Sequence, residues 1–174
     1  MANIAFLLDT DFEQAEYEDV NDKLVAKGHN TTLITTNDDK QVQGLNHTDK
    51  GDKFTADLFA KDANASDYDA IVLPGGTVNA DALRINETAQ NMVKAFADSE
   101  KLVAAICHAP WIFVNTGLAK GKTLTAYKTL QADLENGGAT FVDKEVQQDG
   151  NFITSRTPDD IDAFVDAIDK AVNV

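Results

Sequence analysis

The stretch K-L-V-A-A-I-C-H-A-P-W-I-F-V-N-T, Lys101 to Thr116, determines how the rest of the chain is interpreted. It begins with a continuous apolar run, Leu102 to Ile106, which has the length and composition of a buried parallel strand. A second apolar stretch, Trp111 to Val114, is typical of a helix, and the only cysteine of the chain, Cys107, lies between the two. A sharp strand-to-helix turn presents one side chain at the edge of a sheet, so we predict that Cys107 is a nucleophile.

The immediate neighbours of Cys107 support this interpretation. Ala105 and Ala109 are small enough for the crowded backbone of such a turn, and His108 follows the cysteine directly. The start of the next helix is expected to favour the thiolate over the thiol. A buried structural cysteine is the commoner fate of a lone cysteine and remains the alternative.

Apolar runs and helical periodicities alternate along the whole chain. Strands are expected at Asn3 to Leu8, Thr31 to Thr36, Ala70 to Leu73, Phe141 to Val146 and Asn151 to Ser155, with a hairpin from Gln41 to Ala56. Helices are expected at Phe12 to Lys27 with Thr10 or Asp11 as N-cap, at Ala80 to Ile85, Glu87 to Ser99 and Lys128 to Glu135, and after a Thr157/Asp160 capping box. The alternation predicts one doubly wound α/β domain over residues 1–174, a mostly parallel sheet with helices on both faces.

Composition excludes several classes of protein. The 29 acidic and 15 basic residues give a formal charge of −14, which argues against a nucleic-acid partner. No apolar run approaches membrane-spanning length, and the N-terminus lacks the pattern of a signal peptide. We therefore expect no membrane partner. A single cysteine cannot form an internal disulfide, so we expect a cytoplasmic protein. No spacing of His, Cys and carboxylates predicts a metal site.

Ligands of such sheets bind at the carboxyl ends of the strands. Glu16 lies in the first turns of the helix after the first strand and, as a partly buried acid, could hydrogen-bond the Cys107 sulfur and pass protons. The alternative is a solvated acid on an acidic helix. His108 could act as a base, whereas His29 and His47 are expected to be surface residues.

Gly75 and Gly76 follow the buried strand that ends at Leu73. A backbone N–H from this turn, paired with that of His108, would form an oxyanion hole for carbonyl chemistry. The alternative is a tight turn without a chemical role.

These residues lie in motifs that together resemble one known family. The motifs are F-E-Q-A-E (Phe12 to Glu16), Y-D-A-I-V-L-P-G-G (Tyr68 to Gly76), A-I-C-H-A-P (Ala105 to Pro110), L-T-A-Y (Leu124 to Tyr127), N-G-G-A (Asn136 to Ala139) and D-G-N-F-I-T-S-R-T-P-D-D (Asp149 to Asp160). In this order the chain resembles the ThiJ/PfpI superfamily, and within it the PfpI-type intracellular proteases and stress-response deglycases. The resemblance implies a flavodoxin-like sandwich, similar to class I glutamine amidotransferases, and a homo-oligomer of two or more subunits.

The resemblance also implies roles for individual residues. Cys107 matches the nucleophile, Glu16 the acid that hydrogen-bonds it, and Gly76 and His108 the backbone donors of the oxyanion hole. In PfpI-type members a neighbouring subunit supplies the acid that orients the histidine. The nearest match is Asp81, an aspartate in place of glutamate, in a loop that is one residue longer.

The leading functional prediction is a cofactor-independent glyoxalase III or deglycase that acts on a small dicarbonyl or its glycated adducts through Cys107, Glu16 and His108. One alternative is an intracellular cysteine peptidase with Asp81 as the third triad member. The other is a redox-sensing stress protein or chaperone that responds through oxidation of Cys107.

Overall fold

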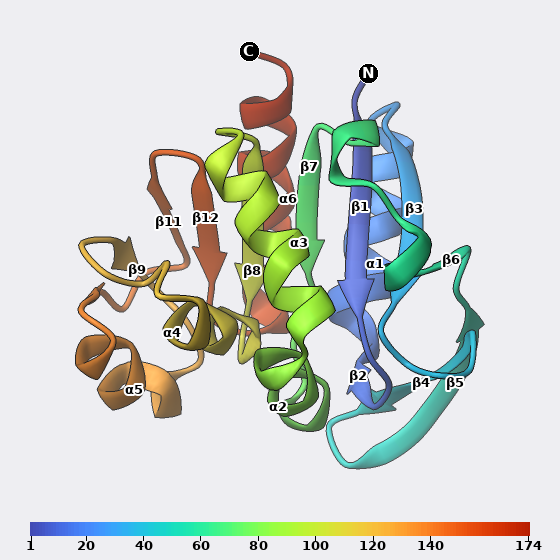
Figure 1. Ribbon diagram of the computed structural model, residues 1–174, viewed down its shortest axis with the longest axis horizontal. Coiled ribbons are helices and arrows are strands. Elements are labelled where there is room, and N and C mark those ends of the chain that lie inside the picture. The colour runs from blue at the N-terminus through green and yellow to red at the C-terminus, as the bar shows by residue number, and fades with distance from the viewer.

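A seven-stranded sheet lies at the centre of the computed structural model, which describes all residues 1–174 (Figure 1). Its strands are β1 (Asn3–Leu8), β3 (Asn30–Thr35), β6 (Leu58–Phe59), β7 (Ala70–Leu73), β8 (Leu102–Ile106), β11 (Val146–Asp149) and β12 (Phe152–Ser155). The order across the sheet is β11-β12-β8-β7-β1-β3-β6, and every neighbouring pair is parallel except β11 with β12. The predicted α/β fold with a mostly parallel sheet is therefore confirmed.

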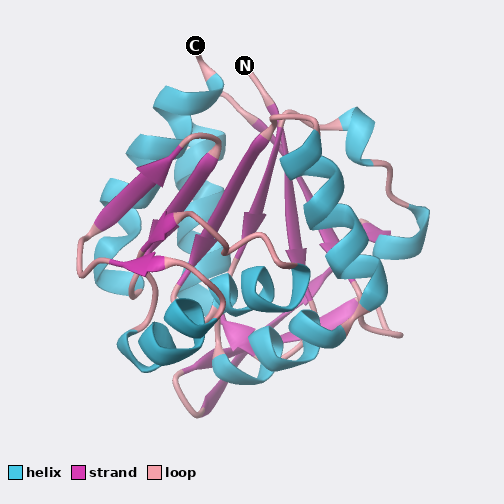
Figure 2. Cartoon of the chain, turned by 60° about the vertical axis from the view of Figure 1, so that its left-hand side comes forward, coloured by secondary structure: helices cyan, strands magenta, loops and turns pink.

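Helices cover both faces of this sheet (Figure 2). Helices α1 (Gln14–Ala26) and α6 (Ile161–Val172) pack together on one face, behind the sheet in Figure 1. The opposite face is covered by α2 (Thr77–Ile85), α3 (Glu87–Asp98), α4 (Ile112–Thr116) and α5 (Gln131–Asn136). Short 3-10 helices lie at Ala60–Asp62, Ala65–Asp67, Ala109–Trp111, Lys128–Leu130 and Pro158–Asp160.

Two small sheets flank the central one. Strands β4 (Gln41–Asn46) and β5 (Asp49–Thr55) form the predicted hairpin, and β2 (Phe12–Glu13) pairs with β4. Strands β9 (Thr123–Leu124) and β10 (Thr140–Phe141) pair with each other. Figure 1 shows the hairpin beyond the carboxyl end of β1, where it can form one wall of a site.

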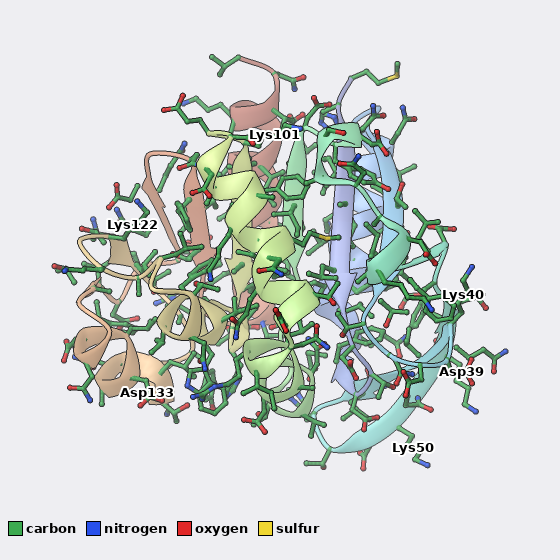
Figure 3. The ribbon with its side chains drawn as sticks, in the orientation of Figure 1. Asp39, Lys40, Lys50, Lys101, Lys122 and Asp133 are labelled. Atoms are coloured by element: carbon green, nitrogen blue, oxygen red, sulfur yellow. The ribbon has the colours of Figure 1, made fainter.

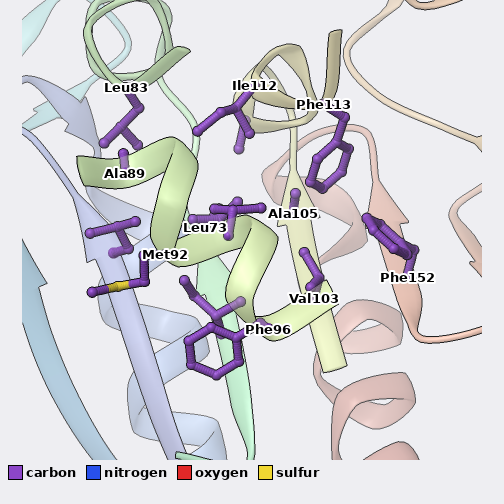
Figure 4. Close-up of a cluster of buried hydrophobic side chains, with 14 of the residues drawn as sticks. Leu73, Leu83, Ala89, Met92, Phe96, Val103, Ala105, Ile112, Phe113 and Phe152 are labelled. Atoms are coloured by element: carbon purple, nitrogen blue, oxygen red, sulfur yellow. The ribbon is translucent and has the colours of Figure 1, made fainter. Parts of the chain in front are cut away.

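A hydrophobic core fills each face of the central sheet, because buried parallel strands direct successive side chains to opposite sides. On the α3 face, Leu73, Val103 and Ala105 from the strands pack against helical side chains such as Phe96 (Figure 4). On the α6 face, Phe164 is fully buried in the second cluster. Two cores sharing one sheet explain why the strands appear as continuous apolar runs in the sequence.

The predicted start of the first helix is wrong by two residues. Phe12 and Glu13 form β2 through pairing with Gly44 and Leu45, so α1 begins at Gln14. The residue before the helix is Glu13, and its side chain makes no capping hydrogen bond. Thr10 and Asp11 are therefore not N-caps; tertiary pairing with the hairpin overrides the local helix signal.

Two further local predictions are wrong. The strand expected from Phe141 to Val146 is divided, because Thr140–Phe141 pairs with β9 whereas Val146–Asp149 pairs with β12. The capping box before α6 does not form, since the Thr157 side chain caps nothing and the Asp160 carboxylate instead accepts hydrogen bonds from Arg156. A residue pattern cannot distinguish these partners.

The order of the strands determines where a ligand can bind. The chain passes from β1 to β3 on one side and then returns to β7 on the other, so a switch in strand order lies between β7 and β1. The carboxyl ends of β1, β7 and β8 meet at this edge, and open α/β sheets bind ligands there. No helix of the chain combines the length and apolar character that crossing a membrane requires.

Candidate active site

Cys107 occupies the sharp turn between β8 and the 3-10 helix Ala109–Trp111. Its φ of 64° lies in the left-handed region, which costs a side-chain-bearing residue roughly 1–3 kcal/mol. The backbone is fixed from both sides, because the Cys107 N–H donates to the Ser155 carbonyl at 3.0 Å and the Cys107 carbonyl accepts from the Tyr127 N–H at 2.8 Å. The sharp turn predicted from the sequence is thus present, and Cys107 is buried.

The imidazole of His108 lies beside the thiol. Its Nδ1 is 3.2 Å from the Cys107 Sγ, and its Nε2 is 3.4 Å from the Thr77 hydroxyl. The ring stacks on Tyr127 with a centroid separation of 4.6 Å. Burial lowers the pKa of His108, so the imidazole is neutral at pH 7 and can exchange a proton with the thiol.

Glu16 reaches the same point from the first turn of α1 and is completely buried. Its Oε1 accepts a hydrogen bond from the Gly75 N–H at 3.0 Å, whereas Oε2 has no partner. Burial, and to a smaller extent the negative charge of Glu13, raises the pKa of Glu16 from 4.5 to about 8. Glu16 is therefore a protonated acid at neutral pH, and it is more buried than the sequence predicted.

The thiol of Cys107 does not behave as the sequence suggested. Burial, followed by the charge of an ionised Glu16, raises the pKa of Cys107, while the N–H groups of Gly76 and His108 lower it. Burial therefore works against the expected preference for the thiolate, and the helix that begins here is short, so its dipole adds little. Protonation of Glu16 removes the opposing charge, so the two groups titrate as a coupled pair.

Gly75 and Gly76 stand where no side chain fits. A Cβ on Gly75 would lie 2.6 Å from the Glu16 Oε1 and 2.9 Å from the Cys107 Cβ. Gly76 has a φ of 89°, and a Cβ there would lie 2.6 Å from the Glu13 nitrogen. Because the Gly75 N–H is already bonded to Glu16, the donors left at the sulfur are the N–H groups of Gly76 and His108.

Asn79 positions two of the loops around the site, a role that the sequence analysis missed. Its side chain accepts from the Asp9 N–H at 2.6 Å and donates to the carbonyls of Pro74 and Gly75 at 3.0 and 2.9 Å. The residue is fully buried near the start of α2. The available signal in the sequence was an amide side chain three residues after the P-G-G turn. When such a group is buried, it requires hydrogen-bond partners.

Glu16, Gly76, Cys107 and His108 line a cleft of about 940 Å³. Its walls combine the predicted loops with the β4–β5 turn, helix α2 and the turn before α6. The lining residues are Asp11, Glu13, Ala15, Glu16, Leu45, Asn46, His47, Thr48, Gly76, Thr77, Val78, Cys107, His108, Tyr127, Thr157, Pro158 and Asp159. The contribution of the hairpin was not predicted from the sequence, because it depends on tertiary packing alone. Three of the four non-glycine residues with positive φ, Asp11, His47 and Cys107, line this cleft.

The two other histidines differ from each other. His47 is exposed as predicted, yet it lines the cleft, and its backbone N–H donates to the Glu13 carboxylate. The surface prediction for His29 is wrong, because its ring is buried and bonds the Ala2 N–H and the Asp169 carboxylate at 3.2 and 2.8 Å. His29 therefore has a structural role far from the cleft.

Residues 2–171 match the model of the DJ-1/PfpI family. The chain belongs to this family. It is 38% identical over 161 residues to a Bacillus subtilis (strain 168) protein named "Putative cysteine protease YraA" and 40% identical over 163 residues to General stress protein 18 of the same organism, with 92% of each chain covered in both comparisons.

A solved structure supports the same assignment of family and fold. A two-domain protein from Anabaena variabilis, with DJ-1/ThiJ/PfpI-like and ferritin-like domains, superposes with a TM-score of 0.92 at 29% identity. The match covers 99% of this chain and 48% of the other, so this chain spans about half the length of that protein.

The remaining residue that the family resemblance suggested, Asp81, does not contact the site within one chain. It is exposed on α2 and its side chain makes no hydrogen bond or salt bridge, whereas the ring nitrogens of His108 face Cys107 and Thr77. A role for Asp81 across a subunit boundary stays a prediction. No group of three or more His, Cys, Asp or Glu side chains is placed to hold a metal ion.

Proposed function

We propose that this protein is a cysteine-dependent enzyme that converts small reactive dicarbonyls, or their adducts on proteins, into hydroxy acids. The observation that carries the proposal is the position of a buried acid, Glu16, whose pKa lies near 8, next to the only thiol of the chain. An acid with this pKa can both donate and accept a proton near neutral pH, as isomerisation of a carbonyl compound requires.

With methylglyoxal the first step is addition of the Cys107 sulfur to the aldehyde carbon. The thiol proton passes to the aldehyde oxygen, with His108 as carrier, and the product is a hemithioacetal. In this proposal the N–H groups of Gly76 and His108, which act on the sulfur in the free protein, stabilise the developing oxyanion.

The second step is a proton transfer between neighbouring carbons. Ionised Glu16 removes the proton from the former aldehyde carbon, and protonated Glu16 returns it to the adjacent carbon, while the hydroxyl proton moves to the ketone oxygen. The result is a lactyl thioester on Cys107, which water hydrolyses to lactate and the free thiol. The sequence of steps is an isomerisation followed by hydrolysis, so no electron acceptor is consumed.

The test is lactate release from methylglyoxal in the absence of glutathione and added metal. We expect release by the wild type and by Asp19→Asn, an exposed acid on the same helix, and none above background by Cys107→Ala or Glu16→Ala. A folded wild type without lactate release would refute the proposal. Activity on glycated proteins requires a separate measurement on purified adducts.

A second candidate function is peptide hydrolysis, which the name of the Bacillus subtilis relative YraA supports. It requires Asp81 to reach His108 of a second subunit, since the two do not meet within one chain. This candidate predicts that Asp81→Ala abolishes peptide cleavage while lactate release stays unchanged. The third candidate, a redox role through Cys107, predicts oxidation of this cysteine by peroxide, which intact mass detects.

A further inference from the structure

The cleft around Cys107 has an unusual balance of charge. Its lining includes four acids, Asp11, Glu13, Glu16 and Asp159, and contains no lysine or arginine. The lysines labelled in Figure 3, at positions 40, 50, 101 and 122, are not among the lining residues. A carboxylate or phosphate on a substrate would therefore meet no permanent cation inside this cleft.

The arginine next to the cleft in the chain is engaged elsewhere, and the neighbouring Lys128 lies outside the lining. Arg156 directly precedes the lining residue Thr157, but its guanidinium bonds the Asp160 carboxylate at 2.9 and 3.0 Å and the Asp143 carboxylate at 2.9 Å. These bonds also fix the turn that carries the exposed Asp159. The arginine thus holds an acid at the mouth of the cleft without neutralising it.

Glu13 places negative charge deeper in the cleft. Its side chain is only 13% exposed, and both carboxylate oxygens accept from the backbone N–H of His47, at 3.3 and 3.2 Å. The His47 imidazole lies 3.8 Å from the same carboxylate but is 87% exposed, so it can turn away from an incoming cation. Glu16 adds an unpartnered oxygen, Oε2, which is completely buried at the same cleft.

We propose that the cleft selects substrates whose carbonyl carries a cationic or neutral tail over those with an anionic tail, and that Asp11, Glu13 and Asp159 determine this preference. Within the proposed substrate class, a dicarbonyl with an uncharged or cationic tail is then preferred to one that carries a carboxylate. The proposal rests on the proposed function for its carbonyl group, whereas the charge preference is a property of the cleft. Clefts lined by one sign of charge change encounter rates by factors of 10 to 1000, and salt weakens the effect.

The charge preference can be measured without turnover, because the chain has a single cysteine and that cysteine lies in the cleft. Two methanethiosulfonates differ only in their tails, ethyltrimethylammonium or ethylsulfonate. In each, the Cys107 sulfur displaces methanesulfinate and forms a mixed disulfide, which intact mass detects. The measured quantity is the ratio of the two rate constants, in which slow access to the buried thiol cancels. Division by the same ratio for 2-mercaptoethanol removes the difference in intrinsic reactivity between the two reagents.

At low salt we expect the cationic reagent to react about ten times faster than the anionic one after normalisation. In 0.5 M NaCl this ratio should fall towards unity. Asp159→Asn and Asp11→Asn should each reduce the ratio about two- to threefold. Asparagine tolerates the left-handed φ of 58° at position 11, so this substitution changes charge rather than backbone. Asp98→Asn, an exposed acid at the end of α3 outside the cleft, is the matched control and should leave the ratio unchanged.

A wild-type ratio near unity would overturn the proposal, as would an equal response of Asp98→Asn and the two cleft variants. The outcome is independent of the proposed function. A high ratio without lactate release would support the charge preference and refute the dicarbonyl activity. A ratio near unity with lactate release would refute the charge preference and support the dicarbonyl activity.

Discussion

Substitution of Glu16 by glutamine should change how the stability of the protein depends on pH. In the folded protein burial raises the pKa of Glu16 to about 8, whereas the unfolded chain has the ordinary value of 4.5. Between these values the folded state holds a proton that the unfolded state has released, so the free energy of unfolding falls as pH rises. Below pH 4.5 both states are protonated and above pH 8 both are ionised, so Glu16 contributes no slope there.

The size of the effect follows from about 1.4 kcal/mol per pH unit for one proton. Relative to pH 4.5, the wild type loses about 3 kcal/mol by pH 7 and about 4 kcal/mol by pH 8 through this one group. Glu16→Gln removes the loss while it keeps an oxygen that can accept from the Gly75 N–H. The difference in stability between the variant and the wild type should therefore grow in favour of the variant across this window.

The assay is urea unfolding at pH 5, 6, 7 and 8 under reducing conditions, followed by the fluorescence of Trp111, the only tryptophan. Asp19→Asn serves as control, because an exposed carboxylate on the same helix should leave the difference from wild type nearly constant with pH. Any fixed packing cost of the glutamine amide appears as an offset and does not alter the slope. A Glu16→Gln difference that is independent of pH would refute the account of a buried, protonated Glu16.

Three other substitutions test the framework around the cleft. Gly75→Ala should destabilise the protein by about 1–3 kcal/mol in urea unfolding, because its Cβ would lie 2.6 Å from the Glu16 Oε1 and 2.7 Å from the Ile106 carbonyl. The control Gly137→Ala, with no contact below 3.3 Å, should change stability by less than about 1 kcal/mol. Asn79→Ala should cost about 3 kcal/mol and also reduce lactate release, since it leaves buried backbone groups of two site loops unpaired; normal activity would contradict its positioning role. Phe164→Ala should cost about 3–5 kcal/mol with activity preserved at temperatures where the variant is folded.

The fold was predictable because strands buried on both faces leave continuous apolar runs, and these runs alternate with helical periodicities. The turn at Cys107 was equally visible, since the small residues Ala105 and Ala109 flank the cysteine where the strand ends; its positive φ came only from the structure. The burial of Glu16 was not visible, because an acid inside an acidic helix looks the same whether its face meets solvent or a glycine turn. Only the packing of α1 against Gly75 decides between them.

The walls of the cleft were predictable only in part. The turns that follow β1, β7 and β8 could be placed from the sheet topology alone. The wall formed by Asn46, His47 and Thr48 could not, because it depends on a two-residue pairing between Phe12–Glu13 and β4 that carries no sequence signal of its own. The same pairing moved the start of α1, so one tertiary contact explains both the missed wall and the misplaced helix start.

The backbone conformations at the cleft also bear on how this protein can be improved as a reagent. Asp11, His47 and Cys107 all adopt the left-handed conformation, which costs side-chain-bearing residues up to roughly 1–3 kcal/mol each. Selection for heat resistance alone would favour glycine or asparagine at these three positions and would thereby remove the charge, the imidazole and the sulfur from the cleft. Thermostable descendants should instead be sought at distant positions such as the exposed Val25 and Ile85, with the three strained residues held fixed.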